Sequence, residues 1–340
     1  MSNAPAILAV IRRDGPLSRA AIAERTGLSM PTVSRQVAAL IDADLVREAP
    51  GRAPAGSLGR PRVPVDINTG IVAACGVHIG VRTVTYGLAD LRGNLLASER
   101  MPTPERDAFT RIGSRVREFL ANWPHRRIAG VGLATGGQAD TAAGLISHQR
   151  LGWHNVPARD LLQREVGLPV RVDSHVPAMA RAELLFGEGK RFDSMLYFYA
   201  RQVVGVAIVV GGQLHRGPGS IAHLPAGSDV PCPCGRVGCL EATINVHTDS
   251  GRLTERAETI GRAVAHLRDV VNPEQVVLGG QAITEAPAQW ITLLHTFAAT
   301  TALPGADVLT MTRFGPDVQA IAACTTVLGD VYANPRPQWT

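Results

Sequence analysis

Three of the five cysteines fall within eight residues, and a histidine lies just upstream of them. The cysteines stand in Cys232-Pro-Cys234-Gly-Arg-Val-Gly-Cys239, a loop turned by glycines, and the histidine is His223. Three thiols and one imidazole match a tetrahedral zinc site in both number and softness. A filled set of four protein ligands leaves no open position for chemistry, so we expect a structural Zn2+ ion held by His223, Cys232, Cys234 and Cys239.

A disulfide with one spare thiol is the alternative for this cluster. It fits less well, because the N-terminus has no apolar signal segment and a reducing cytosol keeps thiols reduced. The other cysteines, Cys75 and Cys324, are isolated in apolar surroundings and are interpreted as core residues. The sequence therefore predicts a cytoplasmic protein with one zinc loop.

The first sixty-odd residues have the pattern of a helix-turn-helix. Apolar residues recur at helical spacing until Asp14-Gly15-Pro16, after which Ser18 and Ser29 can each cap a further helix. The last of these helices has one apolar stripe and a polar N-terminal end, the part of a recognition helix that enters the major groove. We expect it to contact DNA through Ser29, Thr32, Ser34, Arg35 and Gln36.

A short strand at 45–47 and an extended segment after residue 59 flank a Gly/Pro/Ala loop, which predicts a wing. Arg60 and Arg62 could reach phosphates or a narrow minor groove from it. Residues 1–63 carry nine arginines and five acidic residues, so this segment holds +4 of the chain's net charge of +5. The pattern favours a double-stranded DNA operator as partner, with a protein-docking module as the alternative.

At 340 residues the chain exceeds one typical domain, and 45% hydrophobic residues provide enough apolar material for more than one core. No run approaches the roughly 20 apolar residues of a membrane span. Residues 71–98 alternate like strands and are followed by helical stretches. The same order returns later, with strand-like residues at 195–215 and a helical stretch at 254–271. Residues 68–340 therefore read as a duplicated α/β body with a cleft between two lobes, at about 68–192 and 193–340.

The arrangement resembles the ROK family (repressors, open reading frames, kinases), and in particular its transcriptional regulators. The matching segments include Gly59-Arg60-Pro61, Gly76-Val-His-Ile-Gly80, Gly152-Trp153-His-Asn155, Gly167-Leu-Pro169-Val170, the cysteine cluster with Leu240-Glu241, and Asn272-Pro273-Glu274 leading into Gly279-Gly280. The resemblance implies a winged helix-turn-helix at 1–67 joined to a two-lobed sugar-kinase-like body with an actin-like ATPase fold.

At several positions the sequence lacks the residues that the kinases of that family use, and these differences determine whether kinase activity is expected. At the phosphate loop, the position of the family's aspartate is His78 and that of its second glycine is Val81, whose branched side chain should crowd a phosphate. The catalytic aspartate falls at His175, its asparagine neighbour at Ser174, and a sugar-binding glutamate at Ser220. We expect no kinase activity; a retained ATP-dependent sugar kinase is the alternative, because histidine can act as a base.

His223 and Glu241 match positions that contact sugar in the family. The resemblance therefore implies a small polar effector, a sugar or a derivative, near Ser174, His175, His223 and Glu241. The alternative for Glu241 is that it caps or pairs near the metal loop. The prediction is a non-enzymatic regulator of carbohydrate-related genes that works as a homodimer or higher oligomer, because two modules on a palindrome supply affinity that one small helix cannot. A metabolite-binding protein with a protein-docking head is a third interpretation.

Overall fold

The structure is a computed structural model that describes residues 3–49, 63–215, 220–280, 283, 287–305 and 307–335. The chain divides into two compact units. Unit 1 comprises Met1–Ala178 and Gln319–Thr340, and unit 2 comprises Met179–Val318. Among the described residues, no helix is both long and apolar enough to cross a membrane.

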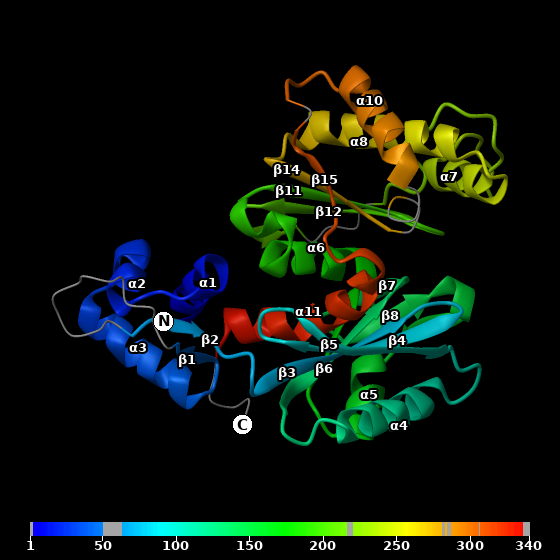
Figure 1. Cartoon of the computed structure of the whole chain (residues 1–340). Coiled ribbons are helices and arrows are strands. Elements are labelled where there is room, and N and C mark those ends of the chain that lie inside the picture. Colours follow the sequence, from blue (N-terminus) through cyan, green and yellow to red (C-terminus); the bar gives the residue numbers. More distant parts are fainter. Residues whose placement is uncertain are drawn as a thin grey trace. The chain divides into compact units, whose positions relative to one another are not determined.

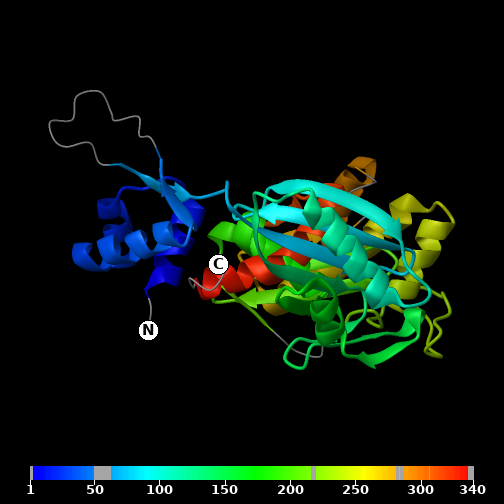
Figure 2. The ribbon, with the colours of Figure 1, turned by 90° about the horizontal axis from the view of Figure 1, so that it is seen from below.

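Unit 1 begins with three helices gathered against a two-stranded antiparallel sheet (Figure 2). These elements are α1 (Ala4–Asp14), α2 (Arg19–Thr26), α3 (Met30–Asp42), β1 (Val46–Glu48) and β2 (Val65–Ile67). The helix α1 ends where Gly15 takes a φ of 87°, and Ser18 caps α2 by accepting the Ala21 N–H at 3.2 Å. The head (residues 3–49 and 63–67) is thus the predicted helix-turn-helix followed by the paired strands of a wing.

The rest of unit 1 is built on a five-stranded sheet in the order β10-β6-β3-β4-β5. Its strands are β3 (Val72–Ile79), β4 (Thr83–Asp90), β5 (Leu95–Pro102), β6 (Arg127–Thr135) and β10 (Val170–Ser174). The helices α4 (Ala108–Ala121) and α5 (Ala158–Val166) cover one face (Figure 1). Their apolar side chains and alternate residues of the strands, such as Val77, Leu133 and Val172, form one buried cluster.

The opposite face of this sheet packs against α11 (Val318–Ala333), which runs across it in Figure 1. The helix lies very close to the strands, because glycines stand where they meet. A Cβ on Gly132 would come within 1.9 Å of the Ala323 carbonyl oxygen, and one on Gly76 within 2.5 Å of the Cys324 nitrogen. Only glycine fits these two sheet positions.

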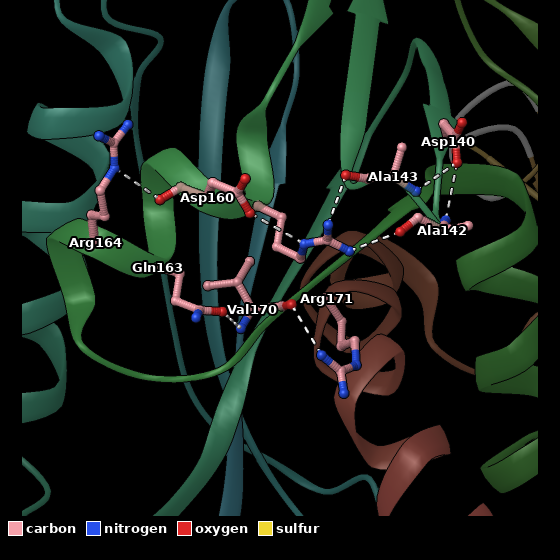
Figure 3. Close-up of polar contacts among 9 residues, drawn as sticks. Asp140, Ala142, Ala143, Asp160, Gln163, Arg164, Val170 and Arg171 are labelled. Atoms are coloured by element: carbon pink, nitrogen blue, oxygen red, sulfur yellow. Dashed lines mark hydrogen bonds and ion pairs between the residues drawn. The ribbon is translucent and has the colours of Figure 1, made fainter.

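A small three-stranded sheet and a following helix complete unit 1. The sheet contains β7 (Gln138–Asp140), β8 (Leu145–His148) and β9 (Trp153–Val156), with the 3-10 turn η1 (Gln149–Leu151) before β9. At the start of α5, the Arg159 guanidinium donates to the carbonyls of Ala142 and Ala143 at 2.9 and 2.7 Å. Asp140 accepts the backbone N–H groups of the same two residues (Figure 3). These contacts fix the β7–β8 turn and hence the course of β8.

Unit 2 repeats the sheet of unit 1, in the order β13-β12-β11-β14-β15. Its strands are β11 (Met195–Ala200), β12 (Val204–Val210), β13 (Gln213–Leu214), β14 (Gln275–Gly279) and β15 (Leu309–Met311). The helices α7 (Leu240–Asp249), α8 (Leu253–Val271) and α10 (Trp290–Thr300) cover one face (Figure 1). In both sheets a central strand pairs antiparallel with its successor and parallel with a later strand, so the predicted duplication is confirmed.

The helix α6 (His175–Phe186) and three short 3-10 turns join these elements. The turns are η2 (Glu188–Arg191), η3 (Pro287–Gln289) and η4 (Gly315–Asp317). The helix begins at His175, a predicted effector residue, and its residues from Met179 onward belong to unit 2. It therefore connects the two units along the chain.

Candidate DNA-binding, metal and effector sites

The helix α3, the predicted recognition helix, separates an apolar from a polar face. Val33, Val37 and Leu40 are buried against the rest of the head. Its other face presents the predicted DNA contacts: Ser29, Ser34 and Arg35 are exposed, and Thr32 and Gln36 are half-buried. Ser29 occupies the N-cap, where its hydroxyl lies 2.9 Å from that of Thr32. The N-terminal end of α3 is thus polar, accessible and rich in hydrogen-bonding groups, as groove recognition requires.

Other arginines of the head are held in ion pairs. Arg25 lies 2.7 Å and Arg13 3.1 Å from the Asp14 carboxylate, and Arg19 lies 2.9 Å from Glu48. These pairs connect α1 with α2 and α2 with β1. The predicted wing arginines, Arg60 and Arg62, lie outside the described residues.

The predicted metal ligands come together in unit 2. One ligand atom from each of His223, Cys232, Cys234 and Cys239 lies within 4.8 Å of all the others. The Cys232 Sγ is 3.7 Å from the His223 Nδ1, and the Cys234 Sγ is 3.7 Å from the Cys239 Sγ. A tight turn carries the first two cysteines, in which Gly235 N–H donates to the Cys232 carbonyl at 2.9 Å. This is the arrangement of a four-ligand metal centre.

The chemistry of these thiols fits a divalent cation. The backbone N–H and the side chain of Arg236 lower the pKa of Cys234 to about 6, so its sulfur is a thiolate at neutral pH. Burial and the two neighbouring thiols raise the pKa of Cys239 to about 11. Three sulfurs this close cannot all be thiolates without a compensating charge, which a bound cation would supply. The donor set of three sulfurs and one imidazole is that of structural zinc.

The predicted effector residues of unit 1 lie among buried histidines. His78, near the end of β3, is 3% exposed, and His175, the first residue of α6, is 7% exposed. The Nε2 of His78 lies 3.4 Å from the Nδ1 of His175, and their rings stack with an interplanar angle of 10°. Ser174 supports this region, since its hydroxyl accepts the Ala139 N–H at 3.0 Å and so ties β10 to β7.

A third histidine, which sequence reasoning missed, faces the same place. His148 ends β8 and is 6% exposed. A Cβ on Gly136 would stand 3.6 Å from both the His148 Nε2 and the His175 Nδ1, so the two rings flank this glycine. Burial, with the nearby Arg150, lowers the pKa of His148. No motif marks His148 in the sequence, because its position depends on the β7–β8 hairpin.

The effector residues predicted in unit 2 have identifiable contacts. Glu241, in the first turn of α7, accepts the Val204 N–H at 3.0 Å and so holds the start of β12. His223 is exposed and faces Cys232 through its Nδ1. Ser220 accepts the Ala222 N–H at 3.3 Å, in a turn that precedes the metal loop.

Arginines connect the head to the remainder of unit 1. Arg127, at the start of β6, donates to the Asp44 carboxylate at 3.1 Å and to the Ala43 carbonyl at 2.6 Å. Arg92 pairs with Asp66 and reaches the Arg12 carbonyl at 3.5 Å. These contacts join both ends of the helix-turn-helix to the sheet.

The last described helix also contacts the head. The Arg12 guanidinium carbon lies 5.2 Å from the centre of the Tyr332 ring, near the end of α11. The buried Tyr332 hydroxyl donates to the Leu91 carbonyl. The helix α11 therefore contacts α1, the first helix of the head, through the Tyr332 ring.

The chain is similar to known proteins over nearly its whole length. Residues 74–247 match the ROK family and residues 6–49 match a helix-turn-helix domain. A transcriptional regulator of Mycobacterium tuberculosis is 38% identical over an alignment of 384 positions that covers 98% of this chain and 86% of that protein. The xylose repressor of Bacillus subtilis is 24% identical over 283 residues, covering 79% of this chain and 71% of that protein.

Solved structures agree with the fold. The crystal structure of a ROK family transcriptional regulator, described as a homologue of the E. coli MLC protein, superposes with a TM-score of 0.79 and 20% identity. The match covers 97% of this chain and 96% of that one, so it includes the head as well as the two-lobed body. The family match over residues 74–247 and the 38% identity across nearly the whole chain show that this protein belongs to the ROK family and carries a helix-turn-helix domain ahead of an actin-like ATPase fold.

Proposed function

We propose that this protein is a DNA-binding transcriptional regulator whose ROK body senses a small polar effector. The observation that carries the proposal is the exposed polar face of α3, on a helix-turn-helix that is fixed to a ROK body. Two recognition helices on a palindromic operator supply the affinity that one lacks, so the working form is a homodimer or a higher oligomer. The match to a xylose repressor supports control of carbohydrate-related genes.

Roles can be assigned along α3. Arg35 and Gln36 are the candidates for base-edge contacts, because arginine reads guanine and glutamine reads adenine through paired hydrogen bonds. Ser29, Thr32 and Ser34 stand at the N-terminal end of the helix, where hydroxyl and backbone N–H groups suit phosphate oxygens. Arg60 and Arg62 complete the proposed interface from the wing.

The test is an Arg35→Ala variant in a gel-shift titration against operator DNA recovered with the wild type. Loss of a base contact should weaken binding by about 1–3 kcal/mol and relax the preference at one base pair. Arg111→Ala, at an exposed position of α4, is the matched control and should bind like the wild type. Unchanged affinity and unchanged site preference of Arg35→Ala would show that α3 is not the reading element.

We propose that the protein does not transfer phosphate. The β3–β4 turn carries Val81 where a kinase needs a glycine, and His78 is stacked on His175 where a carboxylate would act as the base. Phosphoryl transfer depends on many positioned groups, and several are replaced together. Incubation with ATP, Mg2+ and a panel of hexoses and amino sugars should give no phosphorylated sugar, whereas turnover of any of them would establish the kinase alternative.

We propose that the metal is a structural zinc ion. His223, Cys232, Cys234 and Cys239 would hold it, and with four protein ligands it would brace the loop that leads into α7. Cys239 is the N-cap residue of α7 and Glu241 holds β12, so the loop, the helix and the sheet edge are joined within a few residues. The metal loop thus stiffens this side of unit 2.

To regulate DNA binding, an effector bound to the body must change the conformation or position of the head. We propose that α11 conveys this change, because this helix packs without intervening side chains on Gly76 and Gly132 and contacts Arg12 through Tyr332. A ligand shifts the equilibrium only if it binds one arrangement of the body more tightly than another. The contacts of Arg92 and Arg127 with the head would transmit that difference to the recognition helices.

A further inference from the structure

Met30 is an exposed methionine at the first residue of α3. The residue is 46% exposed, and Pro31 beside it is exposed as well. On most surfaces a single exposed methionine needs no explanation. Here it stands at the end of the helix that the proposed function places in the major groove, so the group that it meets there can be inferred from its chemistry.

The charges along α3 indicate which end of the helix lies deepest in the groove. Arg35 is exposed in the second turn, and Asp42, the last residue of the helix, is exposed as well. Met30 and Asp42 are about 18 Å apart along the helix axis. Phosphates repel the carboxylate of Asp42, whereas they attract the positive end of the helix dipole at Met30. The end that carries Met30 is therefore the one that enters the groove.

The exposed face of α3 has few side chains that can reach a base. Ala38 and Ala39 are exposed, and each carries a single methyl group. The longer exposed side chains of the first two turns are those of Met30 and Arg35. The part of α3 that can read bases is therefore short, and Met30 belongs to it.

The first turn of α3 is held by the neighbours of Met30. The Ser29 and Thr32 hydroxyls lie 2.9 Å apart, and the Val33 N–H donates to the Ser29 carbonyl at 3.0 Å. Pro31 has a fixed φ angle that suits the start of a helix. These contacts keep the backbone of Met30 in place, while its unbranched side chain can follow the shape of the surface that it meets.

The chemistry of methionine favours one group of the major groove. Methionine has no hydrogen-bond donor, and its sulfur is only a weak acceptor. The base edges in this groove present donors and acceptors, except for the C5-methyl group of thymine. Contact with that methyl group removes two apolar surfaces from water, whereas contact with a polar edge would leave the edge without a partner.

We propose that Met30 packs on the C5-methyl group of one thymine in each half of the operator, so that α3 requires a T·A pair at that position. The inference rests on the DNA-binding function proposed above and adds a specificity-determining residue to it. Five residues along a helix correspond to about 140° around its axis, so Arg35 and Met30 contact different base pairs.

The experiment is a gel-shift titration with the full-length protein and the operator recovered with the wild type. Each thymine of the operator is replaced in turn by deoxyuridine, which lacks only the C5-methyl group and keeps the base pair. At one thymine per half-site we expect deoxyuridine to weaken wild-type binding about fourfold, and about fifteenfold when both half-sites are replaced. These factors follow from the burial of one methyl group in each half.

Two variants of Met30 assign the response to its side chain. Met30→Ala should weaken binding to the thymine operator about fourfold or more, and deoxyuridine should then have no further effect at that position. Alanine is favourable in a helix, so this variant should fold. Met30→Leu keeps an apolar side chain of similar volume and should retain the response to deoxyuridine.

Two further variants separate this contact from a general loss of binding. Met101→Ala changes a methionine that is 40% exposed on β5 of the body, and it should bind both operators like the wild type. Arg35→Ala should need a higher protein concentration to bind, yet it should keep the deoxyuridine response, because the two residues contact different base pairs.

Three outcomes would overturn the proposal. One is an operator with no T·A pair common to its half-sites; another is that deoxyuridine weakens wild-type binding at no position. The third is that deoxyuridine weakens binding equally in Met30→Ala and in the wild type. Each of these leaves sequence-specific DNA binding intact and refutes only this inference. A wild type that recovers no operator refutes the proposed DNA-binding function and this inference with it.

Discussion

Replacing Glu183 with glutamine should stabilise the protein above neutral pH. Glu183 lies near the end of α6, is fully buried, and accepts hydrogen bonds from the Thr312 hydroxyl and, at 2.8 Å, from the Glu188 N–H. Gly187 packs so closely that a Cβ there would come within 1.9 Å of the carboxylate. Burial, the largest influence, raises the pKa of this carboxyl from 4.5 to about 7.

The magnitude follows from the two pKa values. The folded protein holds a proton on Glu183 between pH 4.5 and about 7, where the unfolded chain releases it, so the free energy of unfolding falls as the pH rises through this window. A difference of about 2.5 between the folded and unfolded pKa values lowers the free energy of unfolding by about 3 kcal/mol at pH 8. Glutamine cannot ionise, and it can accept from the Glu188 N–H while donating to the Thr312 hydroxyl, so it should avoid most of this loss.

Thermal denaturation at pH 5 and pH 8 measures the effect. Glu183→Gln and the wild type should unfold at similar temperatures at pH 5, and the variant should be more stable by several degrees at pH 8. Glu188→Gln changes an exposed carboxylate five residues away, and its unfolding temperature should match that of the wild type at both pH 5 and pH 8. An equal difference between Glu183→Gln and wild type at both pH values would refute the assignment of a protonated, buried carboxyl.

The other predictions concern the metal loop and the head. Cys234→Ser should reduce bound zinc from about one ion per chain to near zero and lower the unfolding temperature, whereas Cys324→Ser, in a buried position of α11, should keep its zinc. Metal analysis of the purified proteins checks both, and a wild type without zinc would contradict the assignment. Tyr332→Phe removes the hydrogen bond to the Leu91 carbonyl and should cost about 1 kcal/mol of stability. It should also reduce the effect of the effector on DNA affinity, and an unchanged effect in gel shifts would exclude α11 as the link.

Much of the head and the metal loop was predictable because their signals are local. Ser18 as the cap of α2 and Gly15 as the end of α1 follow from residue type. The apolar stripe of α3 follows from helical spacing. The spacing of the cysteines, with His223 just upstream, was enough to predict the four residues whose ligand atoms converge. Both β3 and β4 likewise lie within the segment 71–98, where the strand-like alternation predicted strands.

Two helices that are buried on nearly every side were not predicted. The helices α6 and α11 are apolar nearly all round, so no 3.6-residue stripe distinguishes them from buried strands. The close packing of α11 on Gly132 and the meeting of His148 with His175 depend on residues far apart in the sequence. Such contacts follow from the fold and cannot be deduced from spacing.

Recovery of genomic DNA fragments with the purified protein tests the central claim most directly. At moderate salt the wild type should retain a small set of fragments that share a motif with two-fold symmetry, and the Arg35→Ala variant should lose them. Retention of no fragments above background, or of fragments without a common sequence, would contradict a sequence-specific regulator built on α3.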